Sequence, residues 1–457
     1  MSEVTGTLGT HVTPWTESDD VGLVRVRMLR VVHGPTSQGR WPLAILEGET
    51  VAIGREGEVK GPLALVDREV SRHHADVVPA GDGSWRLVDR GSRNGTTVDG
   101  ARITEVTLQH GAVIRIGRTL LLFQDETVRT GKKLAPESPR LLGRSEAIRR
   151  LRSDIAQVAS RAVPVLVLGP TGVGKELVAE EIHRQSGRTG RFVAVNCAGL
   201  PETLAESELF GHVPGAFTGA TGKRDGLFVA ADRGTLFLDE IGEAPPAVQA
   251  KLLRALALGE VRPVGSTETL RVDVRVIAAT HRDLAAEMAR DAFRADLYAR
   301  LSGWVQRVPT LRERLEDVLP LAGMFLARVA PGTRISTRAA EALLRYAWPF
   351  NVRELEQAML SASVRAGGGR VRPEHLPEGI TAVLGPIEAT RTATLAEVPI
   401  DLRVPPDATP DRSDLLAVLA YFEGNVGQVA DYFMKDRKQV YRWIEKLGIE
   451  LDHLRRA

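Results

Sequence analysis

Apolar and polar residues alternate over short runs in the first part of the chain, and glycines interrupt these runs. Between Val21 and Gln124 the runs read LVRVRMLRVV, TVAIGR, SWRLVDR, AVIRIG and TLLLFQ. A period of two puts successive side chains on opposite faces of a strand, and many short strands separated by turns are typical of a β-sandwich. We therefore expect a sandwich over residues 21–126. The polar stretch that follows carries two prolines, which indicates a linker over 127–140.

The pattern changes at Leu141, where short apolar strands begin to alternate with amphipathic helices. Apolar residues first recur at helical spacing, at Ile148, Leu151, Ile155 and Val158. The runs VPVLVLG, RFVAVN, GTLFLDE and VDVRVIAAT then read as strands. Such alternation predicts a parallel sheet covered by helices. We expect this α/β domain over residues 141–380, with a small all-helical lid over 311–380.

The end of the chain divides into a second linker and a small helical domain. Residues 381–410 are rich in Pro, Thr and Ala, which indicates a linker. Residues 411–457 contain three helical segments. The predicted fold class is therefore multidomain: a β-sandwich, an α/β domain with a helical lid, and an all-α domain.

Composition narrows the class of protein. A length of 457 residues allows two to four domains, and 43% hydrophobic with 26% charged residues is ordinary for a globular protein. The formal net charge of +2 means that any nucleic-acid surface must be local. A single cysteine, Cys197, excludes an internal disulfide and fits a reducing compartment. No apolar run approaches the ~20 residues of a membrane helix, and the first residues do not read as a signal peptide. We expect a soluble, cytoplasmic protein with no membrane partner.

A phosphate-binding loop lies between the strand VPVLVL and the helix that follows it. Glycines in such a loop let backbone N–H groups surround phosphates, and the helix N-terminus adds positive potential. Lys175 would reach the β- and γ-phosphates, whereas Glu176 stands where Ser or Thr usually holds magnesium. The candidate ATP-binding loop comprises Gly169, Pro170, Thr171, Gly172, Val173, Gly174, Lys175 and the adjoining Glu176.

A second apolar strand ends in two carboxylates, Asp239 and Glu240. Carboxylates at the C-terminal edge of a strand beside a phosphate loop suit magnesium and a polarised water. We assign Asp239 to Mg²⁺ and ATP binding, and Glu240 to catalysis. The two motifs together indicate a nucleotide hydrolase that uses ATP and Mg²⁺.

The glycine-rich segment ELFGHVPGAFTGA, from Glu208, lies between these motifs. Its Phe217-Thr218 tip indicates an exposed loop, since a buried core does not require such a sequence. The hexapeptide GAFTGA resembles the loop with which bacterial enhancer-binding proteins contact sigma-54. That resemblance implies a loop that moves with nucleotide state and remodels the closed complex of sigma-54 RNA polymerase. The expected contact residues are Gly215, Ala216, Phe217, Thr218, Gly219 and Ala220.

The resemblance to this AAA+ family continues in order from about residue 142 to residue 378. The family's phosphate loop commonly has Glu at the position of Glu176. Asn196 resembles the residue that restrains the catalytic glutamate until the motor loop engages. Thr280 and His281 resemble the first sensor of ATP, where Asn is commoner than His281. A histidine can still donate a hydrogen bond there.

Arginines in the same resemblance imply an oligomer. FRADLYAR, from Phe293, is similar to the arginine-finger segment, so Arg294 and Arg300 would reach a neighbour's nucleotide. WPFNVREL is similar to the second sensor, in which Arg353 touches nucleotide from the lid and Phe350 replaces a usual Gly. Fingers supplied in trans imply a homo-oligomer that assembles from dimers into a ring, usually a hexamer.

Three signals in the sandwich resemble the forkhead-associated (FHA) domain in order and spacing: GR, SRHH and GSRNGT. The resemblance implies binding of phosphothreonine, on a partner protein or a neighbouring copy. Arg55 and Arg72 would supply charge-assisted donors to the phosphate, and Ser71 a hydroxyl. Asn94 would hold the peptide backbone, while His74 is expected to be structural.

The C-terminal helices suggest DNA binding. The last helix carries a basic polar side, and a helix pair with a tight turn and a basic second helix favours a helix-turn-helix. The segment from Gly424 to Ile449 resembles the Fis-type domain that ends most sigma-54 activators, which implies upstream enhancer DNA as a partner. Trp443 would contact either DNA or a partner helix. The candidate DNA-binding residues are Arg437, Lys438, Arg442 and Lys446.

These features favour a sigma-54-dependent activator, an ATPase that binds an enhancer and is regulated by phosphothreonine recognition. A second hypothesis is a DNA-binding switch at ordinary promoters, but such relatives typically lack the intact loop 215–220. A third is a phosphopeptide adaptor with a vestigial ATPase, against which the presence of Lys175, Glu240 and Arg294 argues. Whether the FHA domain represses or activates the ATPase stays open.

Overall fold

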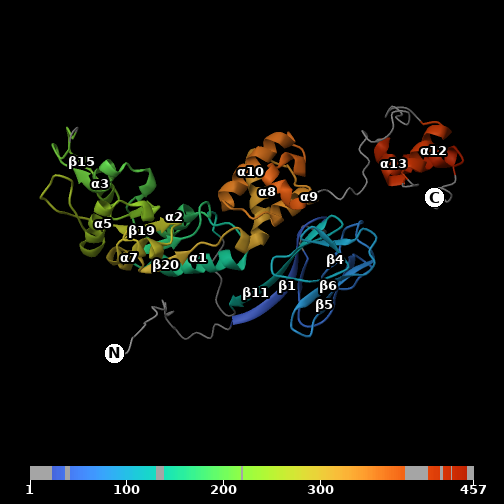
Figure 1. Cartoon of the computed structure of the whole chain (residues 1–457), viewed down its shortest axis with the longest axis horizontal. Coiled ribbons are helices and arrows are strands. Elements are labelled where there is room, and N and C mark those ends of the chain that lie inside the picture. Colours follow the sequence, from blue (N-terminus) through green and yellow to red (C-terminus); the bar gives the residue numbers. More distant parts are fainter. Residues whose placement is uncertain are drawn as a thin grey trace. The chain divides into compact units, whose positions relative to one another are not determined.

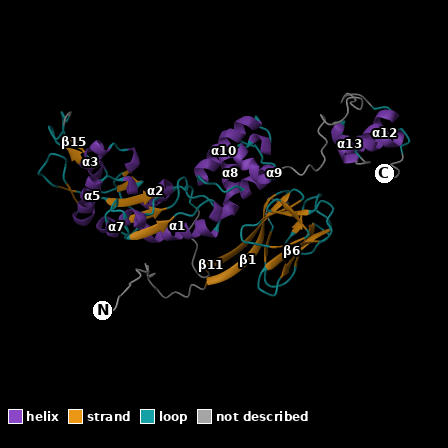
Figure 2. Cartoon of the chain, in the orientation of Figure 1, coloured by secondary structure: helices purple, strands orange, loops and turns teal. Residues whose placement is uncertain are grey.

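The computed structural model describes residues 23–35, 42–129, 138–217, 220–385, 410–422, 426–433 and 435–449. The chain separates into two compact units, Met1–Gly385 and Pro386–Ala457. In Figure 1 the first unit contains, in chain order, a β-sandwich, an α/β domain and a helical lid, and the second unit is a small helical domain. Figure 2 distinguishes the strands of the sandwich, in orange, from the helices of the lid, in purple. The fold class expected from the sequence is confirmed.

In the described residues, the sandwich pairs a six-stranded sheet ordered β2-β1-β11-β10-β7-β8 with a five-stranded sheet ordered β4-β3-β5-β6-β9. Inward-facing side chains such as Leu29, Ile53 and Leu87 are fully buried between the sheets. β11 extends to Arg129 because its last residues pair with the start of β1, so residues 127–129 of the expected linker are strand. The strands are β1 (Leu23–His33), β2 (Leu43–Ile45), β3 (Val51–Arg55), β4 (Ala64–Leu65), β5 (His73–Pro79), β6 (Trp85–Asp89), β7 (Thr96–Val98), β8 (Ala101–Ile103), β9 (Glu105–Thr107), β10 (Val113–Ile116) and β11 (Thr119–Arg129).

The first half of strand β11, residues 119–124, is buried on both faces. Leu121 and Phe123 belong to the core of the sandwich, whereas Leu120 and Leu122 join the core of the lid. The run TLLLFQ therefore lacks the alternation of a half-solvated strand because neither of its faces meets water. This strand joins the sandwich to the lid within one unit.

The α/β domain is built on a parallel sheet with the order β13-β16-β19-β12-β20 in the described residues. On one face, Val165 and Val167 pack with α1 and α2; on the other, Leu166 packs with α3, α5 and α7. The main elements are α1 (Glu146–Ala159), β12 (Val165–Leu168), α2 (Lys175–Gln185), β13 (Phe192–Asn196), α3 (Glu202–Phe210), β16 (Thr235–Asp239), α5 (Pro246–Leu258), β19 (Arg275–Thr280), α7 (Ala295–Leu301) and β20 (Trp304–Arg307). Shorter elements are η1 (Cys197–Gly199), β14 (Gly211–His212), β15 (Arg224–Asp225), α4 (Leu227–Ala230), η2 (Ile241–Glu243), β17 (Glu260–Val261), β18 (Leu270–Arg271) and α6 (Leu284–Ala289).

The lid is entirely helical. Its core includes Leu343, Trp348 and Met359, and the indole N–H of Trp348 donates to Leu343 O at 2.8 Å. Buried indole groups of this kind need such a partner. The elements are η3 (Arg312–Asp317), α8 (Val318–Val329), α9 (Thr337–Arg345), α10 (Asn351–Ala366), η4 (Pro373–His375), α11 (Glu378–Thr381) and η5 (Ala382–Leu384).

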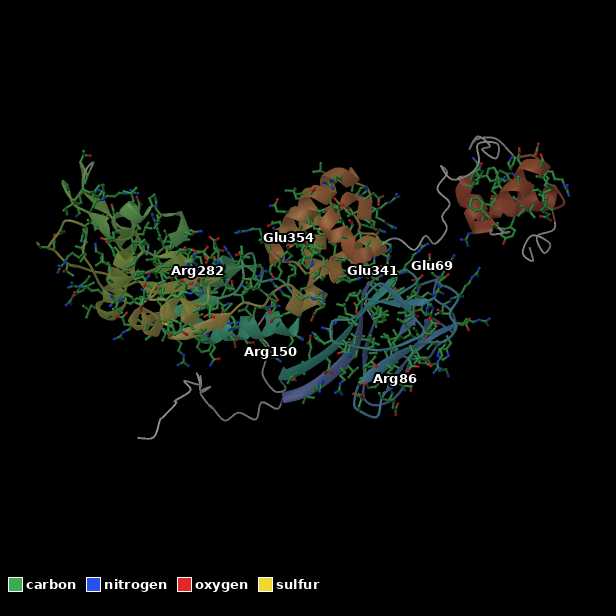
Figure 3. The ribbon with its side chains drawn as sticks, in the orientation of Figure 1. Glu69, Arg86, Arg150, Arg282, Glu341 and Glu354 are labelled. Carbon is green, nitrogen blue, oxygen red and sulfur yellow. The ribbon has the colours of Figure 1, made fainter. Side chains whose placement is uncertain are left out.

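A buried ion pair reinforces the contact between the sandwich and the lid. Glu341 of α9, labelled in Figure 3, has a side chain that is 1% exposed and accepts from Arg115 of β10 at 3.0 Å. Arg338 also donates to it, at 2.9 Å, and Arg345 lies 3.8 Å away. A buried carboxylate must be compensated in this way, because an unpaired charge inside a protein costs several kcal/mol.

Glu316 at the same junction makes the first unit sensitive to pH. Burial, and then the charges of Glu126 and Asp317, raise the pKa of Glu316 to about 7. The folded protein therefore holds a proton that the unfolded chain loses near pH 4.5, so stability from this group declines as pH rises between about 4.5 and 7. We expect Glu316→Gln to flatten that decline and to add about 1–3 kcal/mol of stability at pH 8.

Thermal unfolding followed at several pH values measures this effect. Glu374→Gln, which changes an exposed carboxylate of the lid, is the matched control and should unfold as the parent does. Equal melting temperatures for Glu316→Gln and the parent at pH 8 would contradict the prediction.

The second unit is a bundle of short helices around a small core. Leu415, Leu419, Val429 and Phe433 are fully buried in it. Its helices are α12 (Arg412–Tyr421), α13 (Val426–Tyr432) and α14 (Arg437–Lys446). Across the described parts of both units, no helix combines the length and the apolar character that crossing a membrane requires.

Candidate functional site

The phosphate loop follows β12 directly and leads into α2, as predicted. Gly172 and Gly174 have φ values of +77° and +100°, which glycine adopts without strain. The lid closes on this loop: the backbone N–H groups of Val352 and Arg353 donate to Gly172 O at 3.0 and 3.3 Å. A Cβ on Gly172 would lie 2.1 Å from Phe350 O, so no larger residue fits between loop and lid.

Asn351 is a residue of this contact that the sequence analysis missed. Its side-chain N–H group donates to Thr171 O at 3.0 Å, and its Oδ1 accepts from Leu311 N at 2.9 Å. It adopts a φ of +53° and is 3% exposed. Its place at the start of a helix, directly before Val352 and Arg353, was the available signal.

Lys175 and Glu240 face each other at the edge of the sheet. Lys175 Nζ lies 3.3 Å from Glu240 Oε1 and donates to Gly169 O at 3.0 Å. Burial raises the pKa of Asp239, and the neighbouring Glu240 raises it further. Burial opposes ionisation of Glu240 as well, but its hydrogen bond with His281 and the charge of Lys175 lower its pKa overall. Glu240 is thus held as a carboxylate beside a lysine.

His281 contacts the proposed catalytic carboxylate. Its Nδ1 lies 2.7 Å from Glu240 Oε2, and its backbone N–H donates to the same oxygen at 3.2 Å. Asn196 pairs with Asp239 in the sheet, but its side chain accepts from Ala198 N at 2.9 Å. In this structure, therefore, the glutamate is engaged by His281, and the restraining role of Asn196 stays a prediction.

The other nucleotide-site residues lie around the same edge of the sheet. Thr280 ends β19, is 1% exposed, and its Oγ1 accepts from Arg282 N at 3.0 Å. Glu176 is exposed on the first turn of α2, and Arg353 is exposed on α10 next to Gly172. The loop, the acidic pair and the lid arginine expected from the sequence are brought together.

Arg294 and Arg300 lie at the two ends of α7, and both are exposed. The guanidinium group of Arg294 pairs with Asp296, with an N–O distance of 2.7 Å. This position leaves both side chains available to another copy of the chain. Their role as fingers stays a prediction.

The GAFTGA segment lies in a hairpin loop between β14 and β15. Gly215 N donates to Ala220 O at 2.8 Å and closes the loop, and Phe217 remains 37% exposed. The ring of Phe217 meets the edge of His212, which bonds to Ser207 of α3 at 2.7 Å. Thr218 and Gly219 lie outside the described residues. Phe217 is exposed, as expected for the loop, and the described residues at the base of the loop are held by these contacts.

Three loops of the sandwich gather the candidate phosphothreonine residues. Arg55 Nε donates to Val70 O at 3.1 Å, which holds its side chain across the loop that carries Ser71. Ser71 Oγ accepts from Arg93 N at 3.1 Å, and Asn94 Nδ2 donates to Glu69 O at 2.6 Å.

Exposure at this site suits recognition of another protein. Arg55, Arg72 and Asn94 are exposed, whereas His74 is fully buried and accepts from Ser71 N at 3.0 Å. Gly54 is required at this point, since a Cβ there would lie 2.1 Å from Arg72 O. The arginines are therefore brought to one surface, and the structural role expected for His74 agrees with its burial.

The basic side of α14 is exposed, at Arg437, Lys438, Arg442 and Lys446. Trp443 is 6% exposed and packs edge-on against Phe433, with ring centroids 5.4 Å apart. The ring of Trp443 is therefore covered inside the core of this unit, where Phe433, the residue after α13, contacts it.

Comparison with known proteins identifies the class. The model of the Sigma-54 interaction domain matches residues 141–305, that of the AAA+ ATPase lid domain residues 312–387, and that of the FHA domain residues 51–117. The chain therefore belongs to the family of sigma-54-dependent transcription regulators, with an FHA domain in the same chain.

Individual relatives agree with this assignment. The nitric oxide reductase transcription regulator NorR2 of Cupriavidus necator is 56% identical over 239 residues, which cover 50% of this chain and 46% of that protein. The transcriptional regulatory protein ZraR of Escherichia coli is 49% identical over 253 residues, covering 54% and 57%. The crystal structure of NtrX from Brucella abortus with ADP has a TM-score of 0.50 and 31% identity, covering 68% of this chain and 70% of that one. The chain thus spans about half the length of the curated relatives it matches.

Proposed function

We propose that this protein uses ATP hydrolysis to remodel the closed complex of sigma-54 RNA polymerase while bound to upstream enhancer DNA. The observation that carries the proposal is the exposed hairpin loop around Phe217, on the same domain as the Lys175–Glu240 pair. Hydrolysis of ATP at the phosphate loop, catalysed by the carboxylate, releases free energy. An exposed aromatic loop on the same domain can transmit the resulting movement to a partner protein.

The site residues fit ATP hydrolysis. Lys175 exchanges its contacts with Glu240 and Gly169 O for phosphate oxygens, and the N-terminus of α2 adds positive potential. Glu240 is freed by that exchange to orient and deprotonate the attacking water. Asp239, a carboxylate at the edge of the sheet, would hold Mg²⁺, which neutralises phosphate charge when bound.

His281 links Glu240 to the nucleotide in this mechanism. The ring nitrogen Nδ1 lies 2.7 Å from the carboxylate. A γ-phosphate that competes for the His281 donor would release Glu240 toward the water. His281, at a position where the family more often has Asn, would thus sense the γ-phosphate of ATP.

The loop is tested by Thr218→Ala. We expect ATP turnover to stay within about twofold of the parent, whereas open-complex formation by sigma-54 RNA polymerase is lost, because the loop tip and not the nucleotide site is changed. Both are measured on the same preparation, one by phosphate release and the other by promoter melting. Unchanged promoter melting would refute the proposal and would favour a DNA-binding switch that does not remodel sigma-54.

The FHA domain would regulate this motor by recognising phosphothreonine on a partner or a neighbouring copy. Arg55 and Arg72 offer positive charge on an exposed surface, and Ser71 and Asn94 lie beside them. The β10–β11 side of the same domain packs on α9 of the lid, and the lid in turn contacts Gly172 of the phosphate loop. This continuity gives the bound peptide a physical route to the nucleotide site.

Phosphothreonine recognition is tested by Arg55→Ala. We expect at least a tenfold loss of affinity for a phosphothreonine peptide, because a charge-assisted donor is removed. Calorimetry measures the affinity, and basal ATP turnover should not change. Arg86→Ala, on β6 of the same domain and paired with Glu105, is the matched control. Retained peptide binding in Arg55→Ala would refute this role.

A further inference from the structure

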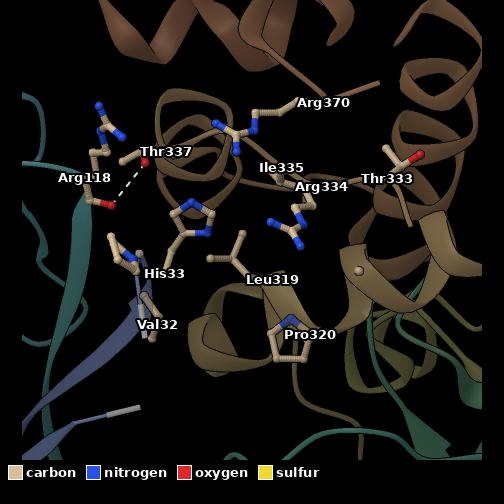
Figure 4. Close-up of a pocket in the computed structure, with 13 residues that line it drawn as sticks. Val32, His33, Arg118, Leu319, Pro320, Thr333, Arg334, Ile335, Thr337 and Arg370 are labelled. Carbon is tan, nitrogen blue, oxygen red and sulfur yellow. Dashed lines mark hydrogen bonds between the residues drawn. The ribbon is translucent and has the colours of Figure 1, made fainter. Parts of the chain in front are cut away.

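A basic cavity lies where the sandwich meets the lid, and none of the residues assigned to the nucleotide site or to phosphothreonine recognition lines it. It has a volume of about 520 Å³, within the range of small-molecule sites. The end of β1 contributes His33, the β10–β11 turn contributes Arg118, and the lid contributes Arg334 and Arg370. In Figure 4 the side chains of Arg334 and Arg370 point toward the ring of His33.

The charge in this cavity is unbalanced. None of its lining residues is acidic. In the described part of the chain, Arg334 and Arg370 have no carboxylate partner, whereas Arg118 pairs with Glu69 at 2.6 Å. Arg334 and Arg370 are both exposed, so their N–H groups are available to donate charge-assisted hydrogen bonds to an anion in the cavity.

A hydroxyl group in the lining joins the two walls of the cavity. Thr337, on the first turn of α9, donates to Arg118 O at 3.1 Å (Figure 4). This bond connects the lid to the turn between β10 and β11 at the edge of the cavity.

Apolar residues make up much of the remaining lining. Val32, Leu319, Pro320 and Ile335 line the cavity beside the basic groups. A lining that combines charged and apolar side chains fits a small molecule better than a polymer of phosphates. Burial and the charge of Arg370 lower the pKa of His33, which agrees with the excess of positive charge around the ring.

We propose that this cavity binds the phosphate group of a small phosphorylated molecule, held by Arg334 and Arg370 beside His33. The ligand would contact β1 of the FHA domain and the lid together. Because it binds only where the two surfaces meet, it would stabilise their contact. Small phosphorylated metabolites would thereby become a second input to the motor, distinct from phosphothreonine.

The test follows the ring of His33 by NMR in the full chain, with the phosphate loop saturated by ADP and Mg²⁺. Histidine Cε1–H signals are recorded during titration with inorganic phosphate and, separately, with 5′-GMP, and His33→Gln assigns the signal. We expect saturable movement of the His33 signal and a rise in its pKa, since a nearby anion favours the charged imidazole. Movement with both probes indicates recognition of the phosphate group itself, and movement with 5′-GMP alone indicates a requirement for the whole nucleotide.

Variants decide whether the cavity is responsible. The double variant Arg334→Ala/Arg370→Ala should weaken the response at least tenfold. Arg328→Ala, which changes an exposed arginine of α8 outside the cavity, should leave it unchanged. A His33 signal that does not move with either probe, or that moves equally in the double variant, would overturn the proposal. Loss of the response in Arg55→Ala alone would assign the phosphate to the FHA surface and would also overturn it.

Discussion

Replacing Glu240 by Gln is expected to reduce ATP turnover about a thousandfold, since a positioned general base contributes roughly 10²–10⁴ in rate. Gln keeps the shape of the side chain and its acceptor toward His281, but it cannot take a proton from water. Binding of ATP should persist, because Lys175 and the loop 169–175 are unchanged. Phosphate release measures the turnover, and a fluorescent ATP analogue measures the binding.

Glu243→Gln provides the matched control. Glu243 lies three residues further on, in η2, and pairs with Arg282 instead of Lys175. Its replacement should alter turnover by no more than a few-fold. If Glu240→Gln retained a tenth or more of the parent turnover, another group would have to activate the water, and the assigned mechanism would be wrong.

Mixing two inactive variants is expected to restore ATP turnover if Arg294 and Arg300 act on a neighbouring subunit. Alone, Arg294→Ala and Arg300→Ala should each lose about 10³-fold or more, the usual contribution of an arginine finger. Lys175→Ala should be inactive because its own phosphate loop is impaired. In a mixed ring, some interfaces combine an intact loop from one subunit with intact fingers from the next, so activity returns at those interfaces.

The mixture is measured by phosphate release at a fixed total protein concentration. Arg290→Ala, which changes an exposed arginine shortly before the finger segment, should have near-parental activity by itself. Absence of recovery, in mixtures whose subunits are seen to exchange, would place the fingers in cis and would remove the argument that the site requires an oligomer.

Much of the fold follows from local patterns. The strand-loop-helix context of Gly169–Lys175 requires only that an apolar run, glycines and an amphipathic helix follow in order. The strand that ends in Asp239-Glu240 brings these carboxylates to the edge where the loop lies, since parallel strands have their carboxyl ends at one edge of a sheet, although β19 stands between the two strands. Such features depend on neighbours in sequence, so the sequence predicts them.

Long-range contacts could not be predicted in the same way. The ion pair between Arg115 and Glu341 joins residues that are 226 positions apart, and neither residue has a local pattern that names its partner. The contact of His281 with Glu240 and the hydrogen bond from Asn351 to Thr171 O likewise depend on how separate elements pack. The run TLLLFQ was the available sign that β11 has no solvent face, but the lid as its second partner could not be deduced from it.

Strand β11 packs into the cores of both the sandwich and the lid. This limits the experiments that can show whether the FHA domain represses or activates the ATPase. Deleting the domain would leave the apolar side of α9 open to water where Leu120 and Leu122 had covered it, and would leave Glu341 without Arg115. A truncated protein that lost activity, or gained it, would therefore report aggregation or a repacked lid together with any release from control. Point substitutions on the exposed phosphothreonine surface keep the joint intact, and they are the appropriate perturbation for deciding whether this domain restrains or promotes the motor.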